Sequence, residues 1–419
     1  MNILQFNRYS ILERPGGTYR YMDDLNRTLA AQGHQVCFVC TTRNNLGRLT
    51  WVERAPGYRI CQLRVSQSRL SRQWDYFVQV PALMYELDNE IRFDAVAIHD
   101  PYIPFGFTTS KMRKRPPLTQ FFYISASHEA AYNARRLRSL LSAEKRVLDG
   151  CEKILSIPLQ RALEHRNLTQ ADRIIVLSEY TRRMLASFHG VSMLNKTALI
   201  PPGVDLQRFS PCNDFRKVRS RLGLPTEATV LLTVRNLSPR MGLENLVQAM
   251  RLVKDALPDQ DVQLCIGGKG ALREVLERMA RDLRLSESVH LLGYVSEEEL
   301  PLYYQACDFF VLPTAALEGF GMVTLEALAT NIPVIGTPIG ATPEILNRFG
   351  GFVADSTSAD GIARKLVEVL QRKDRILASW DSRSLIEGEY SWQRIGRLIE
   401  NLLTNSRGDF RDHASVSYG

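Results

Sequence analysis

The sequence predicts an α/β protein with two domains, each built on a parallel β-sheet. Three observations carry this prediction. The chain has 419 residues, which is too long for one ordinary hydrophobic core. Short β-type runs alternate with amphipathic helical stretches almost from end to end. Two prolines and a glycine within residues 199–205 interrupt the alternation, as linkers do, and a fresh strand–helix series follows them.

Six segments on each side of this linker have the pattern of strands, which indicates a duplicated architecture. They are 2–6, 35–41, 59–64, 95–99, 119–124 and 173–177, then 229–234, 262–267, 289–292, 309–312, 333–336 and 351–354. Apolar residues at spacings of three and four predict helices over 242–254 and 392–402. We expect a first domain over 1–200, completed by a C-terminal helix at 388–405, a second domain over 201–387 and a flexible tail at 406–419. Two such domains would leave a cleft where strand carboxyl ends and helix N-termini collect.

Composition gives the class of protein and excludes several others. The 45% apolar and 23% charged content is that of a globular protein. No apolar run approaches the roughly 18 residues of a membrane span, so we expect a cytoplasmic protein. Seven scattered cysteines argue against a disulfide framework. Cys37 and Cys40 have the spacing of a redox or metal motif, but they lack a second Cys/His pair nearby and are predicted to be buried strand thiols.

The net charge of +8 predicts an anionic partner, which can be a nucleotide, an acidic acceptor or a membrane surface. Basic residues are concentrated in the segment 111–148, which contains nine Lys and Arg but only two Glu. A solvated face is the plainer interpretation of this segment, and peripheral contact with a membrane is the alternative. We expect no nucleic-acid partner, and the sequence does not indicate an oligomeric state.

A glycine pair follows the first predicted strand. Gly16 and Gly17 stand before a predicted helix that runs to about Gln32. Two glycines let the backbone approach a ligand closely, and a helix start offers unpaired N–H groups to an anion. The spacing is not that of the Gly-x-Gly-x-x-Gly dinucleotide motif, so an ordinary loop is the plainer interpretation.

Basic residues and glycines also stand at strand ends in the second half. Arg235 follows one predicted strand and Arg240 precedes a helix, so both would reach a phosphate at the carboxyl edge of the sheet. A solvated loop arginine is the alternative for each. Gly268 and Lys269 follow another strand and repeat this arrangement, with a tight turn as the alternative.

Two carboxylates flank a glycine-containing turn in the segment 312–329. Glu318 precedes Gly319-Phe320-Gly321, and Glu326 lies about one turn inside the helix that follows. Free N–H groups around Met322 and Val323 would hold a diphosphate, while the carboxylates would accept hydrogen bonds from sugar hydroxyls. A helix N-terminus lowers the pKa of a carboxylic acid, which disfavours the pair as acid–base machinery of a hydrolase.

The order of these motifs resembles that of retaining glycosyltransferase family 4. The resemblance rests on the glycine loop, 171–181, 200–205, 239–243, Gly268-Lys-Gly, Gly293-Tyr-Val and Glu318-x7-Glu326. It covers nearly the whole chain and is stronger in the second half. It implies the GT-B fold, in which two Rossmann-like parallel-sheet domains face a central cleft, the first binding the acceptor and the second the donor.

This resemblance also implies an activity. The chain would be a hexosyltransferase of polysaccharide or glycoconjugate biosynthesis that moves a sugar, with retention, from a nucleoside diphosphate sugar to an acceptor hydroxyl. It would need no cofactor and no essential metal. A sugar-nucleotide epimerase of the same fold is the nearest alternative, and a non-catalytic sugar-nucleotide-binding protein is another.

Roles for the second-half residues follow from the family's motif. Glu318 would contact the donor sugar's hydroxyls and Glu326 the nucleotide ribose. Backbone groups would bind the sugar and diphosphate at Phe320, Gly321, Met322 and Val323, and the base at Tyr294 and Val295. The family's usual basic pair is replaced by Asn236 and Met241, which leaves Arg235 and Arg240 to neutralise the diphosphate.

The first half departs from the family at a histidine that relatives often place after the strand at 119–124. Ser125 or His128 takes that place here. His99 is a further candidate for the cleft, with a satisfied strand-end histidine as the alternative. Asp259 and Asp261 have the spacing of a metal motif, but they lie between a helix and a strand, where acidic loop residues are common.

Overall fold

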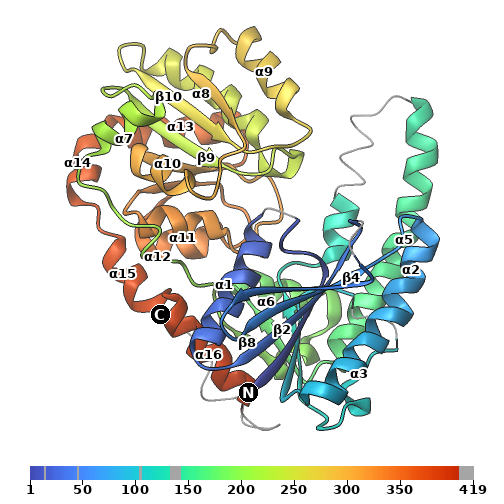
Figure 1. Cartoon of the computed structure of the whole chain (residues 1–419). Helices are drawn as coiled ribbons and strands as arrows, with labels where there is room; N and C mark the ends of the chain where they lie inside the picture. The colour runs from blue at the N-terminus through green and yellow to red at the C-terminus, as the bar shows by residue number, and fades with distance from the viewer. Residues whose placement is uncertain (14–15, 45–46, 103–105, 133–142, 405–419) are drawn as a thin grey trace. The chain divides into compact units, whose positions relative to one another are not determined.

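The structure is a computed structural model that describes residues 1–13, 16–44, 47–102, 106–132 and 143–404. For residues 69, 70, 73 and 143–156 it describes the backbone alone. The chain divides into two compact units (Figure 1). The first unit contains Met1–Pro202 and the C-terminal segment from Trp392, and the second contains Gly203–Ser391. The first division falls two residues after the boundary predicted at 200, and the second falls four residues after the boundary predicted at 387.

The first unit is built on an eight-stranded sheet in the order β3-β4-β2-β1-β5-β6-β7-β8. The strands are β1 (Asn2–Tyr9), β2 (Gln35–Thr42), β3 (Leu49–Ala55), β4 (Tyr58–Arg64), β5 (Ala95–Ile98), β6 (Leu118–Phe122), β7 (Arg173–Val176) and β8 (Thr197–Leu199). All neighbours are parallel except β3 and β4, which form an antiparallel edge. Prediction of six strands here was wrong because β3 is a half-exposed edge strand that carries charges and β8 has only three residues.

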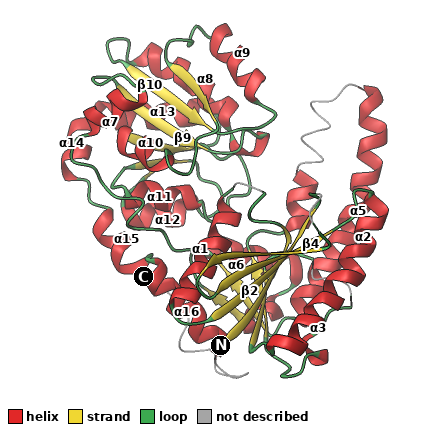
Figure 2. Cartoon of the chain, viewed as in Figure 1, coloured by secondary structure: helices red, strands yellow, loops and turns green. Residues whose placement is uncertain are grey.

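The second unit is built on a six-stranded parallel sheet in the order β11-β10-β9-β12-β13-β14. Its strands are β9 (Thr229–Val234), β10 (Val262–Gly267), β11 (Val289–Gly293), β12 (Phe309–Leu312), β13 (Val334–Gly336) and β14 (Phe352–Val353). Figure 2 shows β9 and β10 of this sheet with helices beside them. All six were predicted within two residues at each end. The central strands are buried on both faces, and for this reason their sequences are nearly continuous apolar runs.

Helices cover both sheets. Those of the first unit are α1 (Gly17–Ala31), α2 (Arg69–Trp74), α3 (Val80–Ile91), α5 (Ala143–Gln170), α6 (Glu179–His189) and α16 (Trp392–Thr404), with a short helix at 126–132. Those of the second unit are α7 (Phe215–Leu222), α8 (Leu243–Ala256), α9 (Arg273–Asp282), α10 (Leu300–Ala306), α11 (Met322–Ala329), α12 (Thr342–Phe349), α13 (Ala359–Gln371), α14 (Lys373–Ser379) and α15 (Arg383–Glu389). In the second unit α8 and α13 bury their apolar faces in one core with β9, β10 and β12.

The terminal helix α16 belongs to the first unit, where it packs against α1. The rings of Trp392 and Tyr21 lie 5.4 Å apart between centroids. A Cβ at Gly396 would lie 2.5 Å from Cγ2 of Thr28, so glycine permits this close approach. The chain therefore crosses into the second unit and returns to complete the first.

Of the basic segment 111–148, residues 133–142 lie outside the described residues, and for 143–148 only the backbone is described. Of its described members, Lys114 forms an ion pair with Asp94 (2.6 Å) and Arg113 donates to the side chain of Asn89 (3.1 Å). Within the part of the chain that the structure describes, no helix combines the length and hydropathy of a membrane span. Contact of this segment with a membrane stays a prediction.

Candidate functional site

The candidate site of the second unit lies at the carboxyl edge of its sheet. Arg235 directly follows β9, Gly268 directly follows β10, and the segment after β12 leads through Thr314 and Glu318 to the start of α11. Carboxyl ends of parallel strands meet at one edge of a sheet, where helix N-termini also collect. The topology thus brings together residues that are far apart in the sequence.

Arg235, Thr314 and Glu318 form a buried cluster at this edge. The Arg235 guanidinium donates to the Glu318 carboxylate and to the Thr314 hydroxyl. The Thr314 hydroxyl in turn donates to Glu318 Oε2 (2.9 Å). The side chains of Arg235 and Glu318 are only 6% and 10% exposed. Arg235 and Glu318 were predicted to meet different parts of a donor, and the structure places them in direct contact.

Glu318 is held ionised by this cluster. Burial alone would raise its pKa, but the charges of Arg235 and Arg240 and the hydrogen bonds from Arg235 and Thr314 outweigh burial and lower it. A carboxylate in this state accepts hydrogen bonds and does not donate a proton. The site therefore offers a fixed negative charge beside a fixed positive one.

Arg240 is held against the same segment from the other side. Its side chain donates to the carbonyl oxygen of Leu317 (3.0 Å), and its own carbonyl accepts the N–H groups of Ala315 and Ala316. Leu317 itself has a φ of 60°, a strained conformation for a non-glycine residue. The turn before Glu318 is thus fixed by Arg240 through its main chain and its side chain.

The turn at Gly319–Gly321 leads into α11. Gly321 has a φ of 84°, which an L side chain rarely adopts, and α11 begins at the next residue, Met322. The side chain of Phe320 is buried and lies 6.4 Å from the ring of Tyr390, so this residue faces the site with its backbone alone. The start of the helix falls where the sequence predicted it.

Glu326 lies one turn inside α11 and is buried. The Tyr304 hydroxyl donates to its Oε2 (2.9 Å), which fixes the orientation of the carboxylate. A hydrogen-bonded carboxylate in this position can accept further hydrogen bonds from a ligand's hydroxyls. Its assignment to a ribose stays a prediction.

Lys269 and Tyr294 form a half-exposed pair beside Gly268. The Lys269 ammonium lies 4.6 Å from the centroid of the Tyr294 ring, a cation–π distance. Gly268 donates its N–H to the carbonyl of Gly293 (2.6 Å), which ties the two loops together. Val295, in contrast, is buried and leaves only its backbone for a ligand.

The first unit has its own cavity, of about 340 Å³, at the carboxyl ends of β1, β5 and β6. Its polar lining includes Arg8, Asp100 and Glu164, none of which the sequence singled out as a site residue. Arg8 forms an ion pair with Asp100 (3.2 Å), and its guanidinium lies over the rings of Tyr76 and Tyr102. Arg8 and Asp100 could have been predicted as site residues because they lie at strand ends. Glu164 could not, because nothing in the sequence distinguishes it from other helical residues.

His99 lines this cavity as a fully satisfied residue. Its Nδ1 lies 2.6 Å from the Tyr123 hydroxyl and its Nε2 lies 2.5 Å from Oε1 of Gln5. Burial lowers the pKa of His99 to about 3, so the ring is neutral at physiological pH. His99 is thus a satisfied strand-end histidine that also lines the cavity, and its contact with a ligand stays a prediction.

Ser125 and His128 lie at the start of the short helix 126–132 and contact other parts of the first unit. Ser125 is completely buried, its hydroxyl donates to Glu164 (3.0 Å), and it accepts the N–H of His128 at the start of the short helix. The ring of His128 packs on Phe188, with centroids 4.8 Å apart. Ser125 is a helix cap here, and a place for Ser125 or His128 beside the reacting sugar stays a prediction.

Gly16 and Gly17 lie at the start of α1, as predicted. Gly16 has a φ of 149° and its carbonyl accepts the N–H of Arg20, so it is the residue that opens the helix. Residues 14 and 15 of this loop lie outside the described residues.

Comparison with known proteins places the chain in a family. A sequence model described as Glycosyltransferase Family 4 matches residues 15–208, and one described as Glycosyl transferases group 1 matches residues 214–383. The chain is 33% identical over 260 residues to the GDP-mannose-dependent alpha-(1-6)-phosphatidylinositol monomannoside mannosyltransferase of Mycolicibacterium smegmatis, covering 60% of this chain and 67% of the relative. The chain belongs to glycosyltransferase family 4. It is a glycosyltransferase.

Other relatives agree with this assignment. The glycosyltransferase is 30% identical over 215 residues to the D-inositol 3-phosphate glycosyltransferase of Corynebacterium urealyticum, covering 49% of this chain and 50% of the relative. The matched regions thus span between half and two thirds of these curated relatives' own length. Among solved structures, sucrose-phosphate synthase of Thermosynechococcus elongatus has a TM-score of 0.76 at 22% identity, over 96% of this chain and 98% of that one. The structural likeness confirms the GT-B fold.

The departures from the family's basic pair have different structural consequences. The side chain of Met241 is buried in the apolar core that α8 and α13 share, so this position supplies no charge. Asn236 is exposed. Arg235 and Arg240 are the basic side chains that flank Glu318 in this glycosyltransferase.

Two further cysteine and carboxylate motifs take no part in the site. Cys37 and Cys40 are buried in β2, as predicted, and burial raises the pKa of each thiol to about 12. Asp259 and Asp261 are exposed and precede β10, at the opposite edge of the sheet from Arg235. Among the described side chains, no group of three or more His, Cys, Asp or Glu is arranged to hold a metal.

Replacing Gly268 with Ala is expected to destabilise the second unit by more than about 1 kcal/mol. Gly268 has a φ of 138°, and an added Cβ would lie 1.8 Å from the carbonyl oxygen of Arg235, so the loop or the end of β9 must move. Gly350→Ala is the matched control, because Gly350 also has a positive φ (70°) but has open space around its Cβ position. Urea unfolding of both variants measures the difference, and equal losses would contradict the close packing against Arg235.

Proposed function

We propose that this glycosyltransferase transfers a hexose, with retention at the anomeric carbon, from a nucleoside diphosphate sugar to an acceptor hydroxyl. The observation that carries the proposal is the contact between Arg235 and Glu318 at the carboxyl edge of the second sheet. It sets one cation and one anion side by side, as a donor with a negative diphosphate and a polyhydroxyl sugar requires.

Transfer breaks the bond between the anomeric carbon and the diphosphate oxygen, and negative charge grows on the diphosphate. Fixed cations and helix N–H groups stabilise such charge without reorganisation. Arg235, Arg240 and the N–H groups at the start of α11 are the groups proposed for this task, so that no metal is needed. Positive charge on the sugar would lie near the ionised Glu318, which is assigned to positioning and electrostatics.

GDP-mannose is the donor that the relatives favour, since the first-named relative is GDP-mannose-dependent. The first-unit cavity is proposed to take the acceptor, and the names of relatives favour an inositol-containing acceptor. A lipid-linked acceptor of this kind would bring the protein to a membrane surface.

The test is a thermal-shift panel of nucleoside diphosphates and their sugars, because a ligand that binds the folded state raises apparent stability. GDP-mannose is then incubated with D-inositol 3-phosphate or phosphatidylinositol monomannoside, with and without a chelator. The anomeric configuration of the product, read by NMR, decides between retention and inversion. If no nucleotide stabilises the protein, the proposed donor site is wrong. If the protein epimerises the sugar of the donor when no acceptor is present, it is an epimerase and the proposed transfer is wrong.

Glu326→Gln is expected to weaken GDP binding by about 1.5–3 kcal/mol, the worth of a hydrogen bond to a charged group. The amide keeps the size of the side chain but loses one acceptor oxygen. Tyr304→Phe is the comparison, because it removes the hydroxyl that contacts Glu326 (2.9 Å) and the Val323 carbonyl (3.3 Å) but leaves the carboxylate in place. Calorimetric titration with GDP measures both, and unchanged affinity in Glu326→Gln would remove Glu326 from the ribose site.

A further inference from the structure

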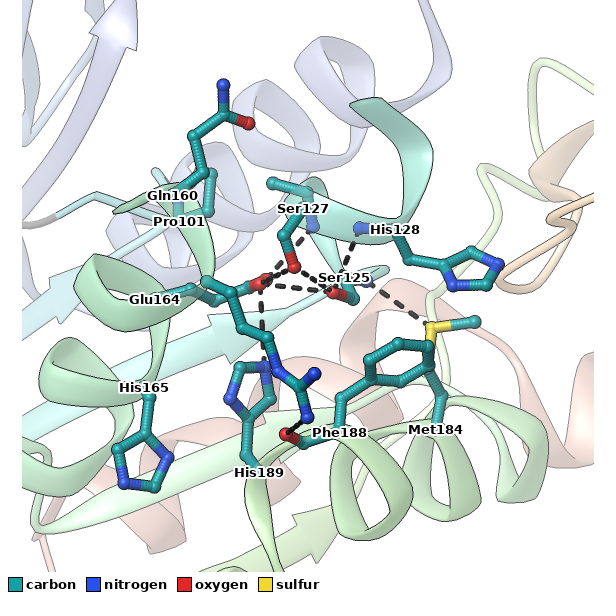
Figure 3. Close-up of polar contacts among 12 residues, drawn as sticks. Pro101, Ser125, Ser127, His128, Gln160, Glu164, His165, Met184, Phe188 and His189 are labelled. Atoms are coloured by element: carbon teal, nitrogen blue, oxygen red, sulfur yellow. Dashed lines mark hydrogen bonds and ion pairs between the residues drawn. The ribbon is translucent and has the colours of Figure 1, made fainter. Parts of the chain in front are cut away.

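Glu164 is a buried carboxylate that contacts polar groups from two other segments of the first unit, residues 125–127 and His189 (Figure 3). It comes from α5 and its side chain is 2% exposed. Its Oε2 accepts the hydroxyls of Ser125 and Ser127, each at 3.0 Å, and its Oε1 accepts the backbone N–H of Ala126 (2.9 Å). Nε2 of His189, from α6, lies 3.4 Å from Oε2.

These donors keep Glu164 charged in the interior. Burial alone would raise the pKa of Glu164, but His189, the Ala126 N–H and the Ser125 hydroxyl outweigh burial and lower it. A buried charge is costly compared with an apolar residue of the same size, so packing alone does not explain this carboxylate. The carboxylate instead fixes the position of the three consecutive residues that donate hydrogen bonds to it, Ser125, Ala126 and Ser127.

The segment held in this way is one wall of the cavity. Tyr123, Ile124, Ala126 and Glu129 line the cavity, and so does Glu164 itself. Tyr123 also holds His99, which lines the cavity from the end of β5. Glu164 thus connects the inner face of α5 to the residues that set the shape of this wall.

We propose that Glu164 is a positioning residue for the acceptor, acting through Ser125, Ala126 and Ser127 to fix the cavity wall. The proposal rests on the proposed function, in which this cavity takes the acceptor. Without the carboxylate, the wall samples other positions and the acceptor binds less well. The donor residues belong to the second unit, so donor binding is unaffected.

Glu164→Gln tests the proposal because the amide keeps the shape but has one acceptor oxygen, so it cannot accept both the serine hydroxyls on one side and the Ala126 N–H on the other. Asp88→Asn is the matched control. Asp88 is also a buried carboxylate that accepts backbone N–H groups, from Phe93 and Arg113, but it does not line the cavity. Amide hydrogen exchange of residues 123–129 is compared in the two variants, and steady-state kinetics are measured with GDP-mannose and with D-inositol 3-phosphate or phosphatidylinositol monomannoside.

In Glu164→Gln we expect faster exchange over 123–129 and an acceptor KM raised about tenfold, with the donor KM unchanged. Asp88→Asn should lower stability without either effect. Addition of Ser127→Ala to Glu164→Gln should have little further effect on the acceptor KM, because both changes remove the same interaction. Unchanged exchange, or faster exchange with an unchanged acceptor KM, would overturn the proposal. If the wild type transfers to neither acceptor, the proposed acceptor class fails, and the exchange measurement alone decides whether Glu164 fixes the wall.

Discussion

Arg235→Met is expected to lower kcat at least about 100-fold, the effect of removing one preorganised charge-stabilising donor from an active site. The variant removes the guanidinium that contacts Glu318 and that is proposed to neutralise the diphosphate. It should also weaken GDP binding, because the diphosphate then faces Glu318 with less compensating positive charge. Steady-state kinetics with GDP-mannose and calorimetric titration with GDP measure the two effects.

The same variant should change how stability depends on pH. In the wild type, the lowered pKa of Glu318 adds stability that is present above the ordinary carboxyl value of 4.5 and is lost as the pH falls through the lowered value. Without Arg235, we expect burial to outweigh the remaining effects of Arg240 and Thr314 and to raise the pKa of Glu318. The ionisable carboxyl then costs stability as the pH rises above about 4.5. The loss of unfolding free energy, about 3–5 kcal/mol for a broken buried pair, should therefore be larger at pH 8 than at pH 5.

Arg219→Met is the control for these two effects. Arg219 is another buried arginine of the second unit, and it pairs with Asp308 (2.8 Å) at the start of β12, the opposite end of that strand from the Glu318 segment. Its replacement should cost stability and leave kcat unchanged. Equal kcat losses in both variants would mean that instability, not the missing charge at the site, explains the Arg235 result.

The second sheet could be predicted from sequence because its strands are short apolar runs bounded by glycine, proline or charged residues. Val262–Gly267 is an example, buried at every position and ended by glycines. The first sheet was less predictable at its edges. Leu49–Ala55 carries Glu53 and Arg54 and is held by antiparallel pairing with β4, a contact that no periodicity in the segment itself reveals.

The candidate site was predictable in its location but not in its contacts. Strand ends and the glycine turn placed Arg235 and Glu318 at one sheet edge, since parallel strands end together. That these two residues, 83 positions apart, touch each other depends on the turn that Arg240 fixes and on Thr314 between them. The contact of Ser125 with Glu164 was unpredictable for a similar reason, because Glu164 comes from α5 and lies 39 positions away.

Glu318→Gln should distinguish the effect of Glu318 on the donor sugar from its effect on the diphosphate. We expect kcat with GDP-mannose to fall about 100-fold, since the amide keeps the size of the side chain but loses the charge that lies near the reacting sugar. GDP, which has no sugar, should bind at least as tightly as it does to the wild type. The reason is that the variant removes a negative charge beside the diphosphate and leaves Arg235 without a carboxylate to neutralise it. The sign of the change in GDP affinity is thus opposite to that expected for Arg235→Met, although both variants lose turnover. Weaker GDP binding in Glu318→Gln would mean that the pair acts as one structural unit that shapes the start of α11, and the assignment of Glu318 to the sugar would then be wrong.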